Sequence, residues 1–416
     1  MDKDHYDELE TRSAAQREAQ LMAGLPGQVH HAQRNTAAFA EILAGVDALQ
    51  VSSRAALARL PVTRKGDLQA RQRAQQPADP FGGFSALVRG AGMPRIYASP
   101  GPIYEPEGST RDYWRIGRAM YAAGFRAGDL VHNAFSYHMT PGAFLMESGA
   151  HAIGCSVFPA GVGQTEQQLQ AIRELRPVAY AGTPSFLRIL VEKAQEAGSD
   201  IASLRKGLVG GEALPTSLRD WFQERGLAVY QSYATADLGL IAYETSSREG
   251  LVVDEGVLVE IVRPGTGDPV AAGEVGEVVV TTMNPAYPLI RFGTGDLSAE
   301  LPGADPTGRT NMRIRGWLGR ADQTTKIRGM FVHPGQVAEI VRRFPEILRA
   351  RLVVSGEMAN DRMTLQVETA GAPAGLDARI GEAVRDVTKL RADVELVAPG
   401  TLPNDGKVIE DARSYR

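Results

Sequence analysis

Hydrophobic and polar positions follow three successive patterns along the chain. In the first, between about residues 130 and 233, short apolar runs alternate with amphipathic segments long enough for helices. Apolar runs separated in this way predict parallel strands joined by crossover helices. The predicted strands are LVHNAF, CSVFPA, VAYAG, KGLVGG and LAVYQSY, and the predicted helices cover residues 141–153, 165–175, 184–197 and 215–225.

The second pattern covers residues 251–300, where LVVDEGVLVEIVRPGTG and GEVGEVVVTTM alternate apolar and polar positions between glycine turns. This period of two predicts antiparallel hairpins that form a small barrel or a second sheet. From residue 322 the order strand, helix, strand, strand, helix, strand fits an independent small domain. We predict an α/β protein with a large N-terminal domain of mostly parallel sheets, helices and a small barrel (1–320), followed by a small, mobile α+β domain (321–416).

The N-terminal part of the chain has weaker signals. Residues 1–48 have the periodicity of two amphipathic helices. LPVTRKGDL (60–68) is typical of a turn followed by a helix start, with Thr63 as the N-cap. Residues 94–109 are dense in proline and glycine and predict a loop, and a helix is expected next at about 110–124.

Composition limits the classes of function. The chain has 416 residues, a formal net charge of −4 and one cysteine, Cys155. This charge gives no reason to expect nucleic acid or an anionic membrane as a partner. A single cysteine excludes an intrachain disulfide framework and fits a reducing compartment. The sequence lacks a secretory leader and an apolar run long enough to cross a bilayer, so we expect a cytoplasmic protein.

Two of the candidate binding segments follow predicted parallel strands. GGEAL (210–214) and QSYATADLG (231–239) lie where open α/β sheets bind ligands. Tyr233 offers a flat stacking face, and Asp237 offers a hard oxygen ligand for Mg²⁺. A tyrosine buried in the core is an equally good interpretation of Tyr233.

Three further segments carry candidate chemistry, each with a structural alternative. In RFGTGD, Asp296 can accept hydrogen bonds from vicinal hydroxyls, or it can cap a hairpin turn. GRADQTTKIRG (319–329) falls at the predicted domain junction and also fits a solvated linker. In LPNDGKVIEDAR (402–413), the ammonium of Lys407 suits a transient contact with phosphate or carboxylate, and an exposed turn lysine is the alternative.

Taken in order, these segments resemble the phenylacetate-CoA ligase branch of the adenylate-forming (acyl-CoA synthetase, AMP-binding) superfamily over nearly the whole chain. The most branch-specific segments are GQTEQQ and PLIRFGTGD, and LPVTRKGDL, GTPSFLRIL, YATADLG, GRADQTTKIRGMFVHPGQV and LPNDGKV also match. The resemblance implies an AMP-binding domain with a mobile C-terminal lid. It also implies an ATP-dependent, AMP-forming acid:CoA ligase that uses Mg²⁺ and acts on phenylacetate or a related aromatic acid.

The resemblance implies roles for single residues. Asp296 would hold the ribose, Arg320 the ribose or a phosphate, and Asp237 would lie near the magnesium ion. Lys407 would be the catalytic lysine, and Asp322 the hinge of the lid. The remaining cofactor-binding residues would be Gly211, Glu212, Tyr233, Ala234, Thr235, Arg328 and Gly329, and the acyl pocket would be formed by Phe135, Tyr137, His138 and Gly211, with Phe144 and Met146 adding apolar surface.

Two segments depart from the family pattern. ASPGPIYEPEG (98–108) stands where the family has a loop like SSGTTGKPT, so the hydroxyls and the lysine that cradle the β- and γ-phosphates are missing. Two of its prolines remove backbone donors, and Glu105 and Glu107 add negative charge. The family motif Tyr-Gly-x-Thr/Ser-Glu is replaced by YATAD (233–237), where Thr235 is the nearest hydroxyl.

Three functional hypotheses follow. The first is the acid:CoA ligase, with a small carboxylic acid as substrate and a homodimer expected by analogy. The second is a catalytically altered or non-catalytic relative that binds acyl-adenylate or acyl-CoA. The third is an adenylating enzyme that passes the acyl group to a carrier protein.

Overall fold

The computed structural model describes residues 4–263, 266–321, 325–327, 330–332, 334–356, 361–371, 373–403 and 407–413. The chain divides into two compact units, residues 1–214 with 218–318, and residues 319–416 with 215–217. The predicted domain boundary at residue 320 stays a prediction.

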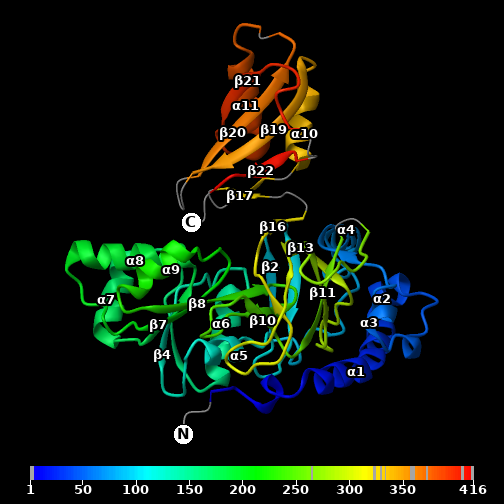
Figure 1. The fold of residues 1–416 in the computed structure, drawn as a ribbon, viewed down its shortest axis with the longest axis vertical. Helices are drawn as coiled ribbons and strands as arrows, with labels where there is room; N and C mark the ends of the chain where they lie inside the picture. Colours follow the sequence, from blue (N-terminus) through cyan, green and yellow to red (C-terminus); the bar gives the residue numbers. More distant parts are fainter. Residues whose placement is uncertain are drawn as a thin grey trace. The chain divides into compact units, whose positions relative to one another are not determined.

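The large sheet of the first unit has the strand order β14-β15-β10-β9-β8-β7-β6-β4-β5 (Figure 1). The run from β5 to β8 is parallel and the rest is antiparallel, so the predicted βαβ series is confirmed. The parallel strands are β4 (Leu130–Asn133), β5 (Ser156–Pro159), β6 (Ala179–Gly182), β7 (Lys206–Val209) and β8 (Ala228–Thr235). The antiparallel strands are β9 (Gly239–Tyr243), β10 (Leu251–Val253), β14 (Glu300–Leu301) and β15 (Arg313–Ile314).

Crossover helices join the parallel strands, and α6 packs on β4 and β5 while α8 packs on β6. Local sequence explains their ends: the Thr183 side chain caps α8 at its N-terminus, and Gly198 ends it in the left-handed conformation. The predicted helix at 110–124 is too long, because Asp112 and Arg115 have positive φ and delay the helix start. The helices are α5 (Ile116–Ala122), α6 (Gly142–Ala152), α7 (Thr165–Leu175), α8 (Pro184–Ala197) and α9 (Thr216–Gln223).

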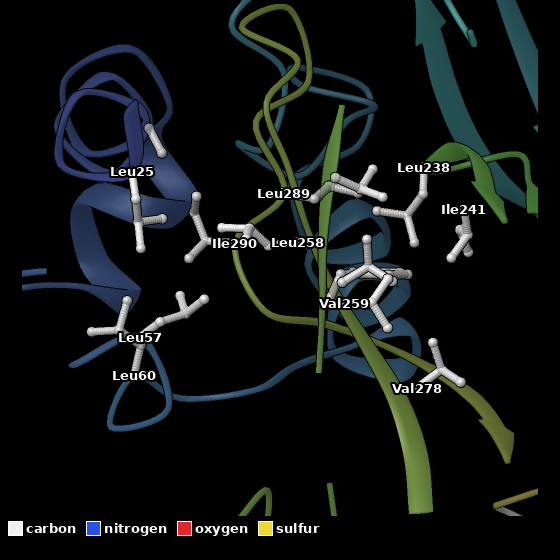
Figure 2. Packing of buried hydrophobic residues seen from close by; sticks show 14 of the residues in the cluster. Leu25, Leu57, Leu60, Leu238, Ile241, Leu258, Val259, Val278, Leu289 and Ile290 are labelled. Atoms are coloured by element: carbon white, nitrogen blue, oxygen red, sulfur yellow. The ribbon is translucent and has the colours of Figure 1, made fainter. Parts of the chain in front are cut away.

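A second sheet of the first unit has the order β1-β13-β12-β11. The pairs β11–β12 and β12–β13 are antiparallel, which confirms the prediction from period two, and β1 runs parallel to β13. Figure 2 shows Leu25, Leu57 and Leu60 from the N-terminal segment packed in one core with Leu258 and Val259 of β11. The strands are β1 (Thr63–Arg64), β11 (Val257–Val262), β12 (Gly276–Thr282) and β13 (Phe292–Ser298).

The N-terminal segment is helical, as predicted. The prediction of Thr63 as an N-cap is wrong: Thr63 lies in β1, and its N–H donates to the Arg291 carbonyl at 2.9 Å. Helix α4 begins after Arg64 with no side-chain cap. The elements are η1 (Glu8–Glu10), α1 (Ala14–Asn35), α2 (Ala37–Ile42), η2 (Ala48–Gln50), α3 (Arg54–Leu57) and α4 (Lys65–Gln75).

The predicted loop at 94–109 is instead an antiparallel hairpin of β2 (Arg95–Ser99) and β3 (Ile103–Glu107). The prolines of this segment are compatible with a hairpin because they lie in its turn or on an edge strand. At these positions the missing backbone N–H is not needed for hydrogen bonding between the two strands. The side chain of Gln72 on α4 also bonds both the N–H and the carbonyl of Tyr104, at 2.9 and 2.8 Å.

The second unit has a sheet of order β21-β20-β19-β22 with two helices against it. The predicted order of strands and helices is confirmed, and β22 is added at the sheet edge. Within the described residues, no helix has the length and apolarity needed to span a membrane. The elements are β16 (Gly319–Arg320), β17 (Thr325–Ile327), β18 (Met330–Val332), α10 (Pro334–Arg343), β19 (Ile347–Ser355), β20 (Arg362–Thr369), α11 (Leu376–Thr388), β21 (Asp393–Val397) and β22 (Ile409–Asp411).

Candidate functional site

Two of the predicted nucleotide-site residues meet although they come from different sheets. The Tyr233 hydroxyl, on β8, donates a hydrogen bond to Asp296 Oδ2, on β13, at 2.8 Å. Both side chains are half-buried, and the Tyr233 ring packs against the apolar core of the first unit. Asp296 lies inside β13 and does not cap a turn. The Tyr233 hydroxyl therefore helps to fix the orientation of the Asp296 carboxylate.

Trp317 joins this pair, and sequence reasoning missed it. Its indole Nε1 donates to Asp296 Oδ1 at 3.1 Å, so both carboxylate oxygens are oriented by neighbouring side chains. Trp317 is 40% exposed. The sequence signal that was available is an aromatic residue three positions before Arg320.

The strand ends beside this pair carry the other predicted cofactor residues. Gly211 follows β7 with a φ of +76°, and a Cβ there would lie 3.8 Å from the ring of Phe135. Glu212 is exposed, and its Oε2 accepts a hydrogen bond from the Ser185 N–H at 3.3 Å. Gly211 and Phe135 are therefore neighbours, as a shared acyl and nucleotide pocket requires.

The YATAD segment forms the end of β8 and the turn into β9. The register shifts between Tyr233 and Ala234, which places an irregularity next to the tyrosine. The hydroxyl of Thr235 accepts a hydrogen bond from the Leu238 N–H at 3.1 Å and thus stabilises the turn. Its proton remains available for donation.

Asp237 is enclosed in the protein. Its side chain is 1% exposed, and Lys65 Nζ, on a side chain that is 38% exposed, lies 2.9 Å from its Oδ2. Its Oδ1 is buried and has no hydrogen-bond partner within the described part of the chain. Lys65 was missed by sequence reasoning as a site residue, although it lies in the LPVTRKGDL segment that carries the resemblance.

Glu105, from the β2–β3 hairpin, lies beside Asp237. It is 1% exposed, and burial, followed by repulsion from Asp237, raises its pKa to about 8. Its carboxyl group accepts hydrogen bonds from the N–H of Ser99, at 3.3 Å, and from the Ser99 hydroxyl. At neutral pH Glu105 is therefore mostly protonated, and the group of Lys65, Asp237 and Glu105 carries a net charge near zero.

The negative charge expected from Glu107 is present but is compensated within the hairpin. Its buried carboxylate accepts two hydrogen bonds from Arg95 Nη1, both at 3.1 Å, and one from the Tyr97 hydroxyl at 2.7 Å. The hairpin thus turns both glutamates inward. It neutralises one with an arginine and keeps the other protonated.

The residues around Asp237 do not fit a magnesium ion as they stand. A Mg²⁺ site needs several oxygen ligands in octahedral geometry, usually with waters. Here Lys65 occupies one carboxylate oxygen of Asp237, and the neighbouring Glu105 carboxyl is protonated at neutral pH. Across the described residues, no group of three or more His, Cys, Asp or Glu side chains is arranged to hold a metal. The metal-binding role of Asp237 stays a prediction.

The predicted acyl-pocket segment follows β4. The Tyr137 hydroxyl donates to Glu147 Oε2 at 2.8 Å and accepts from Asn133 Nδ2 at 2.9 Å, so its polar end is satisfied within the protein. Phe135 is half-buried, whereas His138 is exposed, with its own N–H bonded to the Ser136 hydroxyl.

The apolar slot predicted from this segment is largely filled by its own side chains. Phe144 packs between the rings of Tyr137, at a centroid distance of 5.2 Å, and Tyr97, at 5.4 Å, while Arg95 lies 4.7 Å from its ring centroid. Met146 is buried in the core. Of the predicted acyl-pocket residues, Phe135 beside Gly211 retains the best position for ligand contact.

The second unit carries the remaining predicted residues. Lys407 is exposed and lies two residues before the strand β22, and Arg320 is half-buried in β16. Asp322, Arg328 and Gly329 lie outside the described residues.

Comparison with known proteins identifies the family. Residues 111–286 match the family model of the AMP-binding enzymes, and residues 329–412 match the model of the AMP-binding enzyme C-terminal domain. The chain is 33% identical to a phenylacetate-coenzyme A ligase of Thermus thermophilus over 342 residues, which cover 78% of this chain and 75% of that protein. The chain belongs to the phenylacetate-coenzyme A ligase branch of the AMP-binding enzymes.

Two further comparisons agree with this assignment. The phenylacetate-coenzyme A ligase of Aromatoleum evansii is 31% identical over 378 residues, covering 86% of this chain and 83% of its own. A crystal structure of 2-hydroxyisobutyryl-CoA ligase, in complex with 2-HIB-AMP and CoA, covers 100% of this chain and 94% of its own, with 26% identity and a TM-score of 0.79. The predicted α/β fold class is confirmed, and the chain is an AMP-forming acid–thiol ligase that works through an acyl-adenylate.

Proposed function

We propose that this ligase joins phenylacetate, or a related aromatic acid, to coenzyme A, with Mg–ATP as the second substrate. The relatives named phenylacetate-coenzyme A ligase support this acid and this thiol. The observation that carries the proposal is the carboxylate of Asp296, held by Tyr233 beside the strand ends where Gly211 and Phe135 are neighbours. The first unit therefore holds both a carboxylate for the ribose hydroxyls, that of Asp296, and an aromatic side chain for the acid, that of Phe135.

The proposed reaction has two steps. A carboxylate oxygen of the acid attacks the α-phosphorus of ATP, and pyrophosphate leaves with the electrons of the broken P–O bond. The thiolate of coenzyme A then attacks the acyl carbon of the adenylate, and AMP leaves. In the first step two anions must meet, so positioning and charge neutralisation supply most of the catalysis.

In this scheme Asp296 accepts hydrogen bonds from the ribose hydroxyls, while Tyr233 orients that carboxylate and stacks on adenine. Glu212, Ala234 and Thr235 form the surrounding strand ends. The ammonium of Lys407 supplies the compact positive charge that the first step requires, since lysine suits a transient phosphate contact.

We also propose that residues 321–416 act as a lid on the AMP-binding domain, residues 1–320. The lid would turn about Asp322 and exchange Lys407 for the segment with Arg328 and Gly329, which would line the coenzyme A channel, while Arg320 holds the ribose or a phosphate. A hinge of this kind separates the two half-reactions in time.

The test is formation of acyl-CoA from a panel of acids, followed by mass spectrometry. We expect phenylacetate and ring-substituted relatives to react faster than straight-chain or branched aliphatic acids of similar length. Phe135→Ala should raise KM for the aromatic acids most. A preference for a small branched acid over every aromatic acid would overturn the proposed substrate class.

A second candidate is favoured by the hairpin that replaces the phosphate-binding loop. The buried group of Lys65, Asp237 and Glu105 carries little net charge, and the hairpin presents no cation of its own other than Arg95, which Glu107 neutralises. Such a site suits a nucleoside monophosphate better than a triphosphate. This candidate would form thioester from synthetic phenylacetyl-adenylate and coenzyme A, but not from the free acid with Mg–ATP.

A further inference from the structure

We propose that Tyr97, on the β2–β3 hairpin, is a specificity-determining positioning residue of this ligase. Its ring holds the ring of Phe144 in place, and Phe144 closes the far end of the slot that takes the acid. The hairpin that stands where the family has its phosphate-binding loop thus limits the size of the acid. The inference deepens the proposed function and rests on it, because it takes residues 133–149 as the acid site.

Phe144, at the start of α6, has aromatic and cationic neighbours. The ring of Tyr137 lies at a centroid distance of 5.2 Å and is nearly perpendicular, with an interplanar angle of 80°. The ring of Tyr97 lies at 5.4 Å, tilted by 44°. The guanidinium of Arg95 is 4.7 Å from the Phe144 centroid, a cation–π distance. These three side chains restrict the rotamers of Phe144, and two of them come from the hairpin.

Tyr97 can hold Phe144 because it is itself fixed. It is 4% exposed, and its ring lies 5.8 Å from that of the buried Trp114. Its hydroxyl donates a hydrogen bond to Glu107 Oε2 at 2.7 Å, and Arg95 donates to the same carboxylate. Displacing the Tyr97 ring would therefore open a void in the core and remove a hydrogen bond from a buried carboxylate.

A backbone hydrogen bond also joins the hairpin to the acid segment. The N–H of Ala98 donates to the carbonyl of Met139 at 2.9 Å. Met139 lies in the loop between β4 and α6 and has a φ of +62°, a conformation that is uncommon for a residue other than glycine. Phe135 comes before Met139 in this loop, and Phe144 follows it. The hairpin therefore constrains the segment that carries both aromatic side chains proposed to face the acid.

The aromatic side chains around Phe144 suit an apolar end of the acid. The Tyr137 hydroxyl donates to Glu147 and accepts from Asn133. The Tyr97 hydroxyl donates to Glu107. Both hydroxyl protons are thus engaged within the protein, and a polar group of the acid would lose its hydration here without gaining either proton. The site therefore favours an unsubstituted ring of the size of phenylacetate over a larger ring system.

The experiment compares phenylacetate with biphenylacetate, whose second ring needs more space. The quantity measured is the ratio of kcat/KM for biphenylacetate to that for phenylacetate in acyl-CoA formation. The wild type should strongly favour phenylacetate. In Tyr97→Leu, where Phe144 can turn away, and in Phe144→Leu, the ratio should rise at least about tenfold. The KM for ATP should stay unchanged, whereas a general structural defect would alter it too.

Two variants serve as controls. Tyr97→Phe keeps the ring and loses only the hydroxyl, so it should retain the wild-type ratio. Tyr104→Leu makes the same change as Tyr97→Leu on the opposite face of the hairpin and should also retain it, because side chains alternate along a strand. Thermal unfolding of each variant reports whether it is folded. Phe144→Leu, at a half-buried position, decides the question if Tyr97→Leu does not fold.

An unchanged ratio in the folded variants Tyr97→Leu and Phe144→Leu would overturn the inference alone. So would a wild-type enzyme that uses both acids equally well, or a rise in the ratio of Tyr104→Leu as large as that of Tyr97→Leu. A wild-type enzyme that forms acyl-CoA from none of the aromatic acids would overturn the proposed function, and the inference with it.

Discussion

Glu105 and Asp237 are two carboxyl groups buried next to each other, with one ammonium, that of Lys65, to compensate them. Two adjacent buried carboxylates cannot both be ionised at low cost, so one of them keeps its proton. Lys65 compensates the charge of Asp237. Burial, and then repulsion from Asp237, raise the pKa of Glu105 to about 8, although its hydrogen bond from the Ser99 hydroxyl acts in the opposite direction. Glu105, in the hairpin that stands where the family has its phosphate-binding loop, is therefore mostly protonated at neutral pH.

This gives a prediction for Glu105→Gln. In the unfolded chain Glu105 has an ordinary pKa near 4.5, and in the folded enzyme its pKa is raised to about 8. A raised folded-state pKa contributes stability that is fully present below pH 4.5 and is lost as the pH rises through about 8. Glutamine mimics the protonated acid and does not titrate, so the free energy of unfolding of the variant should gain on the wild type by up to about 1.4 kcal/mol per pH unit across this window.

Urea unfolding at a series of pH values measures this difference. Glu192→Gln, on an exposed helix face, is the matched control and should show little pH-dependent difference from the wild type. A constant gap between Glu105→Gln and the wild type from pH 5 to pH 8 would show that Glu105 is ionised in the folded enzyme.

Strong periodicities made most elements predictable from the sequence. The bounds of α7 and α8 match the prediction, and the antiparallel strands were found from their period of two. The β2–β3 hairpin was missed because its proline and glycine content favours a loop locally. Two contacts that local composition does not reveal stabilise the hairpin. The side chain of Gln72, on α4, bonds the backbone of Tyr104, and Arg95, within the hairpin, pairs with the buried Glu107.

The hairpin's dependence on α4 gives a prediction for Gln72→Ala. The variant removes the amide partner of the N–H and carbonyl of Tyr104, a half-buried residue, and the Gln72 side chain that it removes is itself buried. We expect the free energy of unfolding to fall by about 1–3 kcal/mol and the amides of 103–107 to exchange faster with deuterium. Gln75→Ala on the same helix is the control. Unchanged exchange in the hairpin of Gln72→Ala would contradict the proposed tether.

Site residues that lie in sequence motifs could be predicted, whereas those that act through tertiary contacts could not. Tyr233 and Asp296 are recognisable because each lies in a family motif, and their hydrogen bond was not needed to find them. Lys65 and Trp317 contribute through contacts with Asp237 and Asp296, and a single sequence does not encode such pairings in its periodicity. The roles of the predicted residues stay predictions.

At the scale of the molecule, each unit has a hydrophobic core of its own, which predicts separable stability. Leu365 is fully buried in the core of the second unit, and Leu365→Ala should lower that unit's stability by about 2–5 kcal/mol. AMP binding, which we assign to the first unit, should remain. In limited proteolysis followed by mass spectrometry, Leu365→Ala should be cleaved within residues 330–413 earlier than the wild type. Cleavage of the first unit should be the same in both proteins. Simultaneous loss of both units would contradict separable stability.

The central claim is that this chain activates a carboxylic acid as its adenylate before any thiol takes part. Exchange of labelled pyrophosphate into ATP, measured without coenzyme A, tests it directly. We expect the exchange to require an aromatic acid such as phenylacetate. We also expect its rate to fall at least about tenfold in Lys407→Ala and in Asp296→Ala. An enzyme that binds AMP but shows no acid-dependent exchange with any acid of a broad panel would contradict it.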